Sequence, residues 1–435
     1  MMATPETGLI GVGVLFALLL FGVPIGAALG LVGMGGLVLI LGLEPAIIKS
    51  GVLLIETLVR YELGTLPLFM LMANLFFSAN ASRDLFDAAA KMVGHRKGGL
   101  AIASIGGCAG FGAINGSSLA TAATIGMVAI PEMRKRGYSD ALATGTVAAG
   151  GTLGQMIPPS GALIVFGIIA EQSIGKLFTA AIIPGITQAL FYCVVVWLLV
   201  RIRPDIAPAT ERANWGERWA ALKRVSDMLL LIAFVIGGIA LGWFSPSEAA
   251  SLGVAGALLI AALRRTLGRA MLMTAFDETL RTSGMLLLVI IGALMFSVFV
   301  SVTGLADAIG VFVEGLGWGA IPTMLAMAAL LLLLGSVLDG LALMLLMTPI
   351  LLPIVQSFGL SPVWFGIMLV RAMEIGFVHP PVGMNLFVIQ GVARDVPISR
   401  IFRGVLPFLA SDIVHLVLII LFPAIALWLP EWLGA

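Results

Sequence analysis

Charged side chains are scarce in this sequence. Asp, Glu, Lys and Arg make up only 11% of its 435 residues, whereas 60% are hydrophobic. A soluble protein of this length needs far more charge to cover its surface, so the composition excludes a large water-soluble domain and predicts a polytopic membrane protein. The net charge of +1 argues against a nucleic-acid partner.

Signatures of several kinds of chemistry are absent as well. No Gly-x-x-x-x-Gly-Lys-Ser/Thr motif is present, so no nucleotide-binding site is expected. We find no nucleophile–base constellation and no metal-ligand cluster, and we expect neither an enzyme nor a cofactor. The two cysteines, Cys108 and Cys193, lie in apolar stretches and are interpreted as packing residues rather than a disulfide. The apolar run 8–43 is too long for a cleavable signal peptide and lacks a basic flank.

Glycine and proline, in contrast, interrupt the apolar stretches. Residues 150–161 read Gly-Gly-Thr-Leu-Gly-Gln-Met-Ile-Pro-Pro-Ser-Gly, inside an uncharged segment. Because the two prolines remove backbone donors and clash with the preceding turn, a continuous helix is not expected there. A helix break at membrane depth is tolerated only where protein or a water-filled cavity receives the freed backbone groups. A second stretch of this kind covers residues 373–385, with Pro380-Pro381 placed 222 positions after Pro158-Pro159.

The offset of 222 relates the two halves of the chain. It pairs Gly154 with Gly376, Gly161 with Gly383, Pro131 with Pro353, Gly137 with Gly359, Ser139 with Ser361, Leu119 with Leu341, Ala120 with Ala342 and Pro24 with Pro246. Basic residues flank segment 98–131 on both sides, whereas the connections around segment 321–355 contain none. Because cytoplasmic loops are rich in Lys and Arg, the halves are predicted to have opposite orientations. Inverted repeats with broken helices are typical of secondary transporters.

The sequence predicts an all-α protein with ten membrane spans, two re-entrant hairpins and two broken helices. We assign the first repeat to residues 1–222, with a hairpin at 98–131 and a broken span at 141–170, and the second to 223–435, with a hairpin at 321–355 and a broken span at 363–392. The scaffold comprises 8–80, 227–302, 177–200 and 405–429; loops are expected at 81–97, 201–224 and 303–320, and interfacial helices at 49–62 and 268–281. Two short tilted spans remain an alternative for the first hairpin.

A hairpin tip that faces a broken helix offers both signs of partial charge. Helix N-termini suit a carboxylate, and free carbonyls with hydroxyls suit a small hard cation such as sodium. The Asn115-Gly-Ser-Ser118 turn and Thr152 are candidates for such a site, with an ordinary tight turn as the alternative. Asp339, an acid at membrane depth, is a second candidate; its alternative is a helix-capping role. Arg371 and Glu374 lie three positions apart on one helix face, where they could simply neutralise each other.

Four motifs resemble the large membrane subunit of the tripartite ATP-independent periplasmic (TRAP) transporters. They are Gly94-His-Arg-Lys-Gly-Gly-Leu100, Asn115-Gly-Ser-Ser-Leu-Ala120, Gly151-Thr-Leu-Gly-Gln-Met-Ile-Pro-Pro-Ser160 and Glu374-Ile-Gly-Phe-Val-His-Pro-Pro-Val-Gly-Met-Asn-Leu-Phe387. The resemblance implies sodium-coupled uptake of small organic acids across the bacterial inner membrane by an elevator motion. It also implies two partners, a small four-span membrane subunit and a soluble periplasmic binding protein. His379 departs from the threonine that many members carry.

The resemblance places the functional residues at the two tips and breaks. Sodium would bind at Asn115, Gly116, Ser117, Ser118, Thr152, Gly154, Gly335, Asp339, Gly340, Glu374, Gly376 and Val378. Substrate would bind at Ser160, Arg371 and Asn385. Competing hypotheses are a stand-alone sodium–carboxylate symporter, which adjacent partner genes would argue against, and a channel, which would need a continuous polar stripe.

Overall fold

The computed structural model describes residues 4–77 and 81–434, which form helices joined by turns and no strand. Five of these helices are long and apolar enough to cross a membrane, or six spans if one bent helix pair counts as a single span. The five are α10 (Ile174–Ile202), α12 (Pro246–Leu263), α13 (Arg269–Thr303), α16 (Gly340–Ser357) and α19 (Ile398–Leu421). The predicted all-α, multi-pass membrane architecture is therefore confirmed, whereas the count of ten spans stays a prediction.

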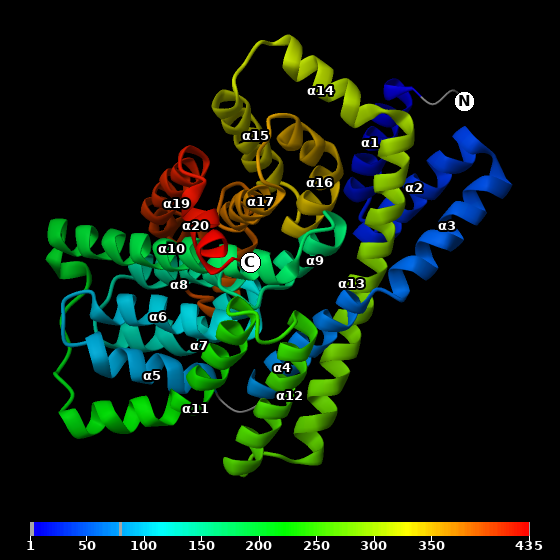
Figure 1. Ribbon diagram of the computed structural model, residues 1–435. Helices are drawn as coiled ribbons and strands as arrows, with labels where there is room; N and C mark the ends of the chain where they lie inside the picture. Colours follow the sequence, from blue (N-terminus) through cyan, green and yellow to red (C-terminus); the bar gives the residue numbers. More distant parts are fainter. Residues whose placement is uncertain (1–3, 78–80, 435) are drawn as a thin grey trace.

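One set of helices, which we call the scaffold group, contains the long helix α13. Its other members are α1 (Pro5–Leu20), α2 (Ile25–Leu41), α3 (Leu43–Leu58), η1 (Tyr61–Gly64), α4 (Thr65–Phe77), α11 (Trp215–Ala240) and α12. Helix α2 runs along α13, and α4 packs on α12 (Figure 1). Gly33 allows the first contact, because a Cβ there would lie 2.6 Å from the backbone of Met295. Small residues at such crossings let membrane helices approach closely.

Most of the remaining helices form a second set, the hairpin group. It contains α6 (Gly99–Asn115), α7 (Ser118–Lys135), α8 (Asp140–Met156), α9 (Gly161–Ile169), α10, α15 (Ala320–Gly335), α16, α17 (Pro362–Gly376), α18 (Met384–Val392), α19 and α20 (Ala424–Leu433). Helices α6 and α7 both pack on α8, and α15 and α16 both pack on α17 (Figure 1). The helix breaks lie where glycine and proline predicted them, and the axes of α8 and α9 differ by 42°.

The helix boundaries repeat with the offset found in the sequence. Helix α7 begins at Ser118 and ends at Lys135, and α16 begins at Gly340 and ends at Ser357, so both ends differ by 222 positions. The contacts repeat too: α2 meets α13 as α12 meets α4, and α8 meets α19 as α17 meets α10.

Three segments predicted as loops contain helices. Segments 81–97 and 303–320 hold α5 (Ala81–Val93) and α14 (Leu305–Gly315), each of which links the scaffold group to a hairpin. Helix α5 is amphipathic: Leu85 and Phe86 are buried, while its charged residues line the opposite side. The predicted loop 201–224 contains the start of α11, where Asn214 and Glu217 form a capping box. Charged and polar residues interrupt the apolar ones in these segments, so a search for long hydrophobic runs did not find the helices.

Other predictions about the spans also need correction. The predicted interfacial helix 268–281 is continuous with the following span in the 35-residue helix α13. The predicted span 405–429 is divided, because α19 ends before Pro423 and the short helix α20 follows. The end of the predicted span 63–80 lies outside the described residues. Helices α10 and α19, predicted in the scaffold, pack against α8 and α17, and their assignment to a domain stays a prediction.

Candidate functional site

The first hairpin tip lies directly against the first broken helix. Gly116 ends α6 with φ of +63°, a left-handed conformation that favours glycine, and Ser117 caps α7 by accepting a hydrogen bond from the Ala120 N–H at 3.5 Å. On α8, a Cβ at Gly154 would lie 2.7 Å from the Ser117 carbonyl oxygen and 2.6 Å from Thr121 Oγ1. The structure thus brings the predicted residues of the tip and of the break together, and only glycine fits between them.

Two buried oxygens near this tip have no hydrogen-bond partner among the described residues. One is Thr121 Oγ1, which would touch a side chain at Gly154, and the other is the side-chain oxygen of Gln155, the next residue of α8. A buried polar atom without a partner in a native structure calls for an explanation, and a bound ion is one possible explanation. Thr121 and Gln155 were missed in the sequence because neither stands in a recognised turn.

The second tip repeats the arrangement with different side chains. A Cβ at Gly376 of α17 would lie 2.5 Å from the Gly335 carbonyl oxygen, and Gly340 lies against Met373. The Asp339 carboxylate accepts hydrogen bonds from the Leu341 N–H at 3.0 Å and the Ala342 N–H at 3.4 Å. Asp339 is therefore the N-cap of α16, and helix capping was the alternative to an ion ligand in the sequence analysis. Val378 is buried two residues beyond the end of α17, and its N–H donates to the Ile375 carbonyl at 3.0 Å.

Asn385 connects the two halves of the chain. Its side-chain amide donates to Ser118 Oγ at 2.9 Å and to the Ala148 carbonyl at 3.0 Å. These bonds hold the start of α18 against the start of α7 and the middle of α8. Ser160 caps α9, accepting from the Leu163 N–H at 3.4 Å, and a Cβ at Gly116 would lie 2.6 Å from the Pro159 carbonyl oxygen. The N-termini of α7 and α9 therefore lie close together, where their partial positive charges add.

Arg371 and Glu374 form a buried ion cluster with Asp412 of α19. Arg371 Nη1 lies 2.8 Å from Glu374 Oε2, and Nη2 bonds to Asp412 Oδ1. All three side chains are at most 1% exposed. The structure thus supports mutual neutralisation of Arg371 and Glu374, and it adds a second carboxylate that the sequence reasoning missed. An acid in the apolar segment 405–429 was the signal that could have revealed it.

The Thr152 hydroxyl belongs to a neighbouring polar network. It accepts a hydrogen bond from Gln188 Nε2 at 3.0 Å, lies 2.9 Å from the Tyr192 hydroxyl and donates to the Ala149 carbonyl at 2.8 Å. These partners, two of them on α10, occupy the hydroxyl. Thr152 therefore supports the packing of α8 on α10, and the Thr121 hydroxyl is the free one beside the tip.

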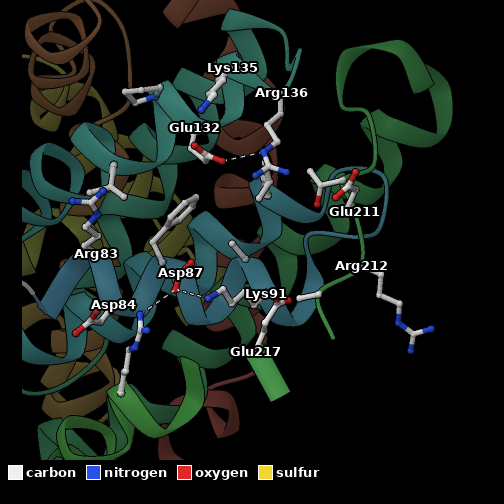
Figure 2. Close-up of a pocket in the computed structure, with 18 of the residues that line it drawn as sticks. Arg83, Asp84, Asp87, Lys91, Glu132, Lys135, Arg136, Glu211, Arg212 and Glu217 are labelled. Atoms are coloured by element: carbon white, nitrogen blue, oxygen red, sulfur yellow. Dashed lines mark hydrogen bonds and ion pairs between the residues drawn. The ribbon is translucent and has the colours of Figure 1, made fainter. Parts of the chain in front are cut away.

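A large cavity lies elsewhere in the described part of the chain. It has a volume of about 1140 Å³ and is lined by α5, the end of α7 and the segment before α11. Figure 2 shows two ion pairs in its lining: Lys91 lies 3.2 Å from Asp87, and Arg136 lies 2.9 Å from Glu132. None of the predicted sodium or substrate residues lines it. We therefore place the candidate site at the tips rather than in this cavity.

Helices broken in pairs inside an apolar, multi-pass protein define a membrane transporter fold. The fold matches the solved YdaH transporter of Alcanivorax borkumensis with a TM-score of 0.59 at 16% identity, covering 90% of this chain and 89% of that one. Residues 12–425 match the family of the DctM component of tripartite ATP-independent periplasmic transporters. The chain belongs to this family, which confirms the resemblance found in its motifs.

Relatives with named substrates cover most of this chain. It is 35% identical to the C4-dicarboxylate TRAP transporter large permease protein DctM of Pseudomonas aeruginosa, over 92% of this chain and 94% of that protein. It is 32% identical to the sialic acid TRAP transporter large permease protein SiaM of Vibrio cholerae, over 96% of both. It is 35% identical to the isethionate TRAP transporter permease protein DctMQ of Oleidesulfovibrio alaskensis, over 95% of this chain and 65% of that protein.

Proposed function

We propose that this chain carries out sodium-coupled uptake of a small organic acid, delivered by a periplasmic binding protein, across the bacterial inner membrane. The relatives named above are assigned to C4-dicarboxylates, sialic acid and isethionate, and all three are organic anions. Such names describe transport and no catalytic step, in line with the expectation that the chain is not an enzyme.

The observation that carries the proposal is the pairing of each hairpin tip with a broken helix. At the first tip, the Ser117 carbonyl and the unpartnered Thr121 hydroxyl offer oxygen ligands of the kind that sodium prefers. At the second, the Gly335 carbonyl approaches Gly376 in the same way. Sodium bound at both tips would hold them against α8 and α17 and so complete the site for the anion.

The substrate carboxylate is best assigned to the helix N-termini between the tips. Ser160 and Asn385 stand at the starts of α9 and α18, and Asn385 contacts Ser118 at the start of α7. Positive helix ends attract anions. Arg371, which the sequence analysis included among the substrate residues, is already balanced by Glu374 and Asp412, so we assign it to the support of α17 instead.

We further propose two inverted repeats, 1–222 and 223–435, and an elevator movement of the hairpin group. The matching boundaries of α7 and α16 support the repeat. The scaffold group is held together mainly by α2–α13 and α4–α12 packing, and it meets the hairpin group through few helices. A small interface between two internally well-packed bodies is what relative sliding requires.

Two partners complete the proposal, a small four-span membrane subunit and a soluble periplasmic binding protein. The family is a component of a tripartite system, and one relative joins two permease components in its name. The scaffold group offers a broad apolar surface for lipid or for a helical partner, including exposed Leu31 of α2 and Ile48 and Ile55 of α3.

The sodium assignment is tested by the sodium dependence of uptake in reconstituted vesicles. Replacing Ser117, Thr121 or Asp339 by Ala should raise the sodium concentration for half-maximal uptake several-fold, because each variant loses a ligand or a cap at a tip. Thr274→Ala, which removes an exposed hydroxyl of α13, is the matched control and should leave it unchanged. Equal uptake in sodium-free buffer with only a proton gradient would show that the ion assignment is wrong.

A further inference from the structure

One ion pair joins the scaffold group directly to the hairpin group. Arg60, between α3 and η1, and Glu171, between α9 and α10, lie 2.7 Å apart from Nη2 to Oε1. Every other ion pair among the described residues lies within one group or involves the connecting helix α5. Arg60 is 34% and Glu171 71% exposed, so the pair is in contact with the surroundings.

The pair is anchored to the end of the broken helix. Arg60 Nη1 also donates to the Ile168 carbonyl at 3.5 Å, in the last turn of α9. Carbonyls at a helix C-terminus carry partial negative charge, so the guanidinium meets two negative groups. Glu171 has a φ of +52°, and the next residue, Gln172, donates its N–H to the Gly167 carbonyl at 2.8 Å. The backbone around Glu171 is therefore tied to the end of α9 and moves with it.

The second half of the chain has no equivalent of this pair. The offset of 222 places Thr282 opposite Arg60 and Ala393 opposite Glu171, and neither residue is charged. The helix packing differs between the halves in detail: α13 contacts α16, whereas α4 contacts α6.

We infer that the Arg60–Glu171 ion pair is a latch, which holds the hairpin group in the present conformation and opens in every transport cycle. The inference rests on the proposed elevator movement, since sliding of α9 past η1 by more than a few ångströms separates the charges. Because the latch exists in one repeat only, it stabilises one end state and not the other. An exposed pair of this kind shifts a two-state equilibrium by about 1.5- to 5-fold, and salt weakens the shift.

Spin-label distances in the complete transporter test the latch. Cysteines are introduced at exposed Glu56 of α3 and Ser357 of α16, after Cys108 and Cys193 are replaced by Ala, and the complex is placed in lipid nanodiscs. We expect two distance populations. Arg60→Glu and Glu171→Arg should each shift their ratio at least 1.5-fold away from the present conformation. The combined charge swap should restore part of the shift, because a glutamate at position 60 cannot donate to the Ile168 carbonyl. Arg281→Glu, at an exposed pair within α13, should have no effect.

The outcomes separate the latch from the movement on which it rests. Two populations whose ratio ignores both single reversals would overturn the latch and leave the elevator intact. A double swap that reduces neither single shift would also overturn it, because the effect would then come from each side chain alone. A single population in every variant, with and without sodium, would overturn the elevator and the latch together.

Discussion

Removing the Arg371 guanidinium is expected to destabilise the hairpin group strongly. Arg371 and Glu374 are 0% exposed and Asp412 is 1% exposed, so Arg371→Met leaves two carboxylates buried without a counter-charge. Breaking a buried ion pair by removing one partner costs about 3–5 kcal/mol. With an unfolding entropy of about 2 cal/mol/K per residue, this lowers the thermal midpoint of a chain of this length by about 3–6 °C.

The assay is thermal unfolding of the purified protein, followed through the fluorescence of its eight tryptophans. Arg281→Met is the control, since it breaks an exposed pair with Asp277 that is worth less than about 1 kcal/mol. A variant with Arg371→Met, Glu374→Gln and Asp412→Asn removes all three charges and should regain part of the loss. A midpoint for Arg371→Met as high as that of the control would refute the reasoning. A charge-free variant no more stable than the single one would refute the electrostatic cause.

Two further predictions concern the tip and the topology. Gly154→Ala should reduce sodium-driven uptake at least tenfold, because its Cβ would lie 2.7 Å from the Ser117 carbonyl oxygen. Gly237→Ala is the control and should leave uptake unchanged, because its Cβ would meet nothing within 4 Å. Equal uptake by both variants would show that close approach at the first tip is not needed. A cysteine at position 357 should react with a membrane-impermeant reagent added from outside, and a cysteine at position 213 should not. The reason is that the charge pattern places residues 356–362 outside and residues 201–224 inside. The reverse labelling would contradict the inverted repeat.

The architecture was largely predictable because glycine and proline mark its breaks. Pro158-Pro159 and Pro380-Pro381 follow the ends of α8 and α17, and Gly116 separates α6 from α7. These residues act locally: they remove hydrogen bonds or permit a left-handed backbone wherever they occur in an apolar run. The connecting helix α5 was predicted as a loop because its apolar face is narrow. Its repeat partner α14 could have been found with it through the offset of 222.

The site was less predictable because its contacts are distant in sequence. Asp412 reaches Arg371 across 41 positions, and Asn385 reaches Ser118 across 267. No spacing rule relates such residues. Thr152 is an example: its position near the break suggested an ion ligand. On the folded helix α8, however, its hydroxyl faces α10 and bonds with Tyr192 and Gln188. The unpaired hydroxyl beside Gly154 belongs instead to Thr121 of α7.

Uptake by proteoliposomes, with one component omitted at a time, tests the central claim most directly. The vesicles contain this chain with a small membrane subunit, and a periplasmic binding protein loaded with one of a panel of organic acids is added outside. The proposed function predicts uptake only when all three proteins and an inward sodium gradient are present. Robust sodium-driven uptake by this chain alone would contradict the tripartite function and favour a stand-alone symporter.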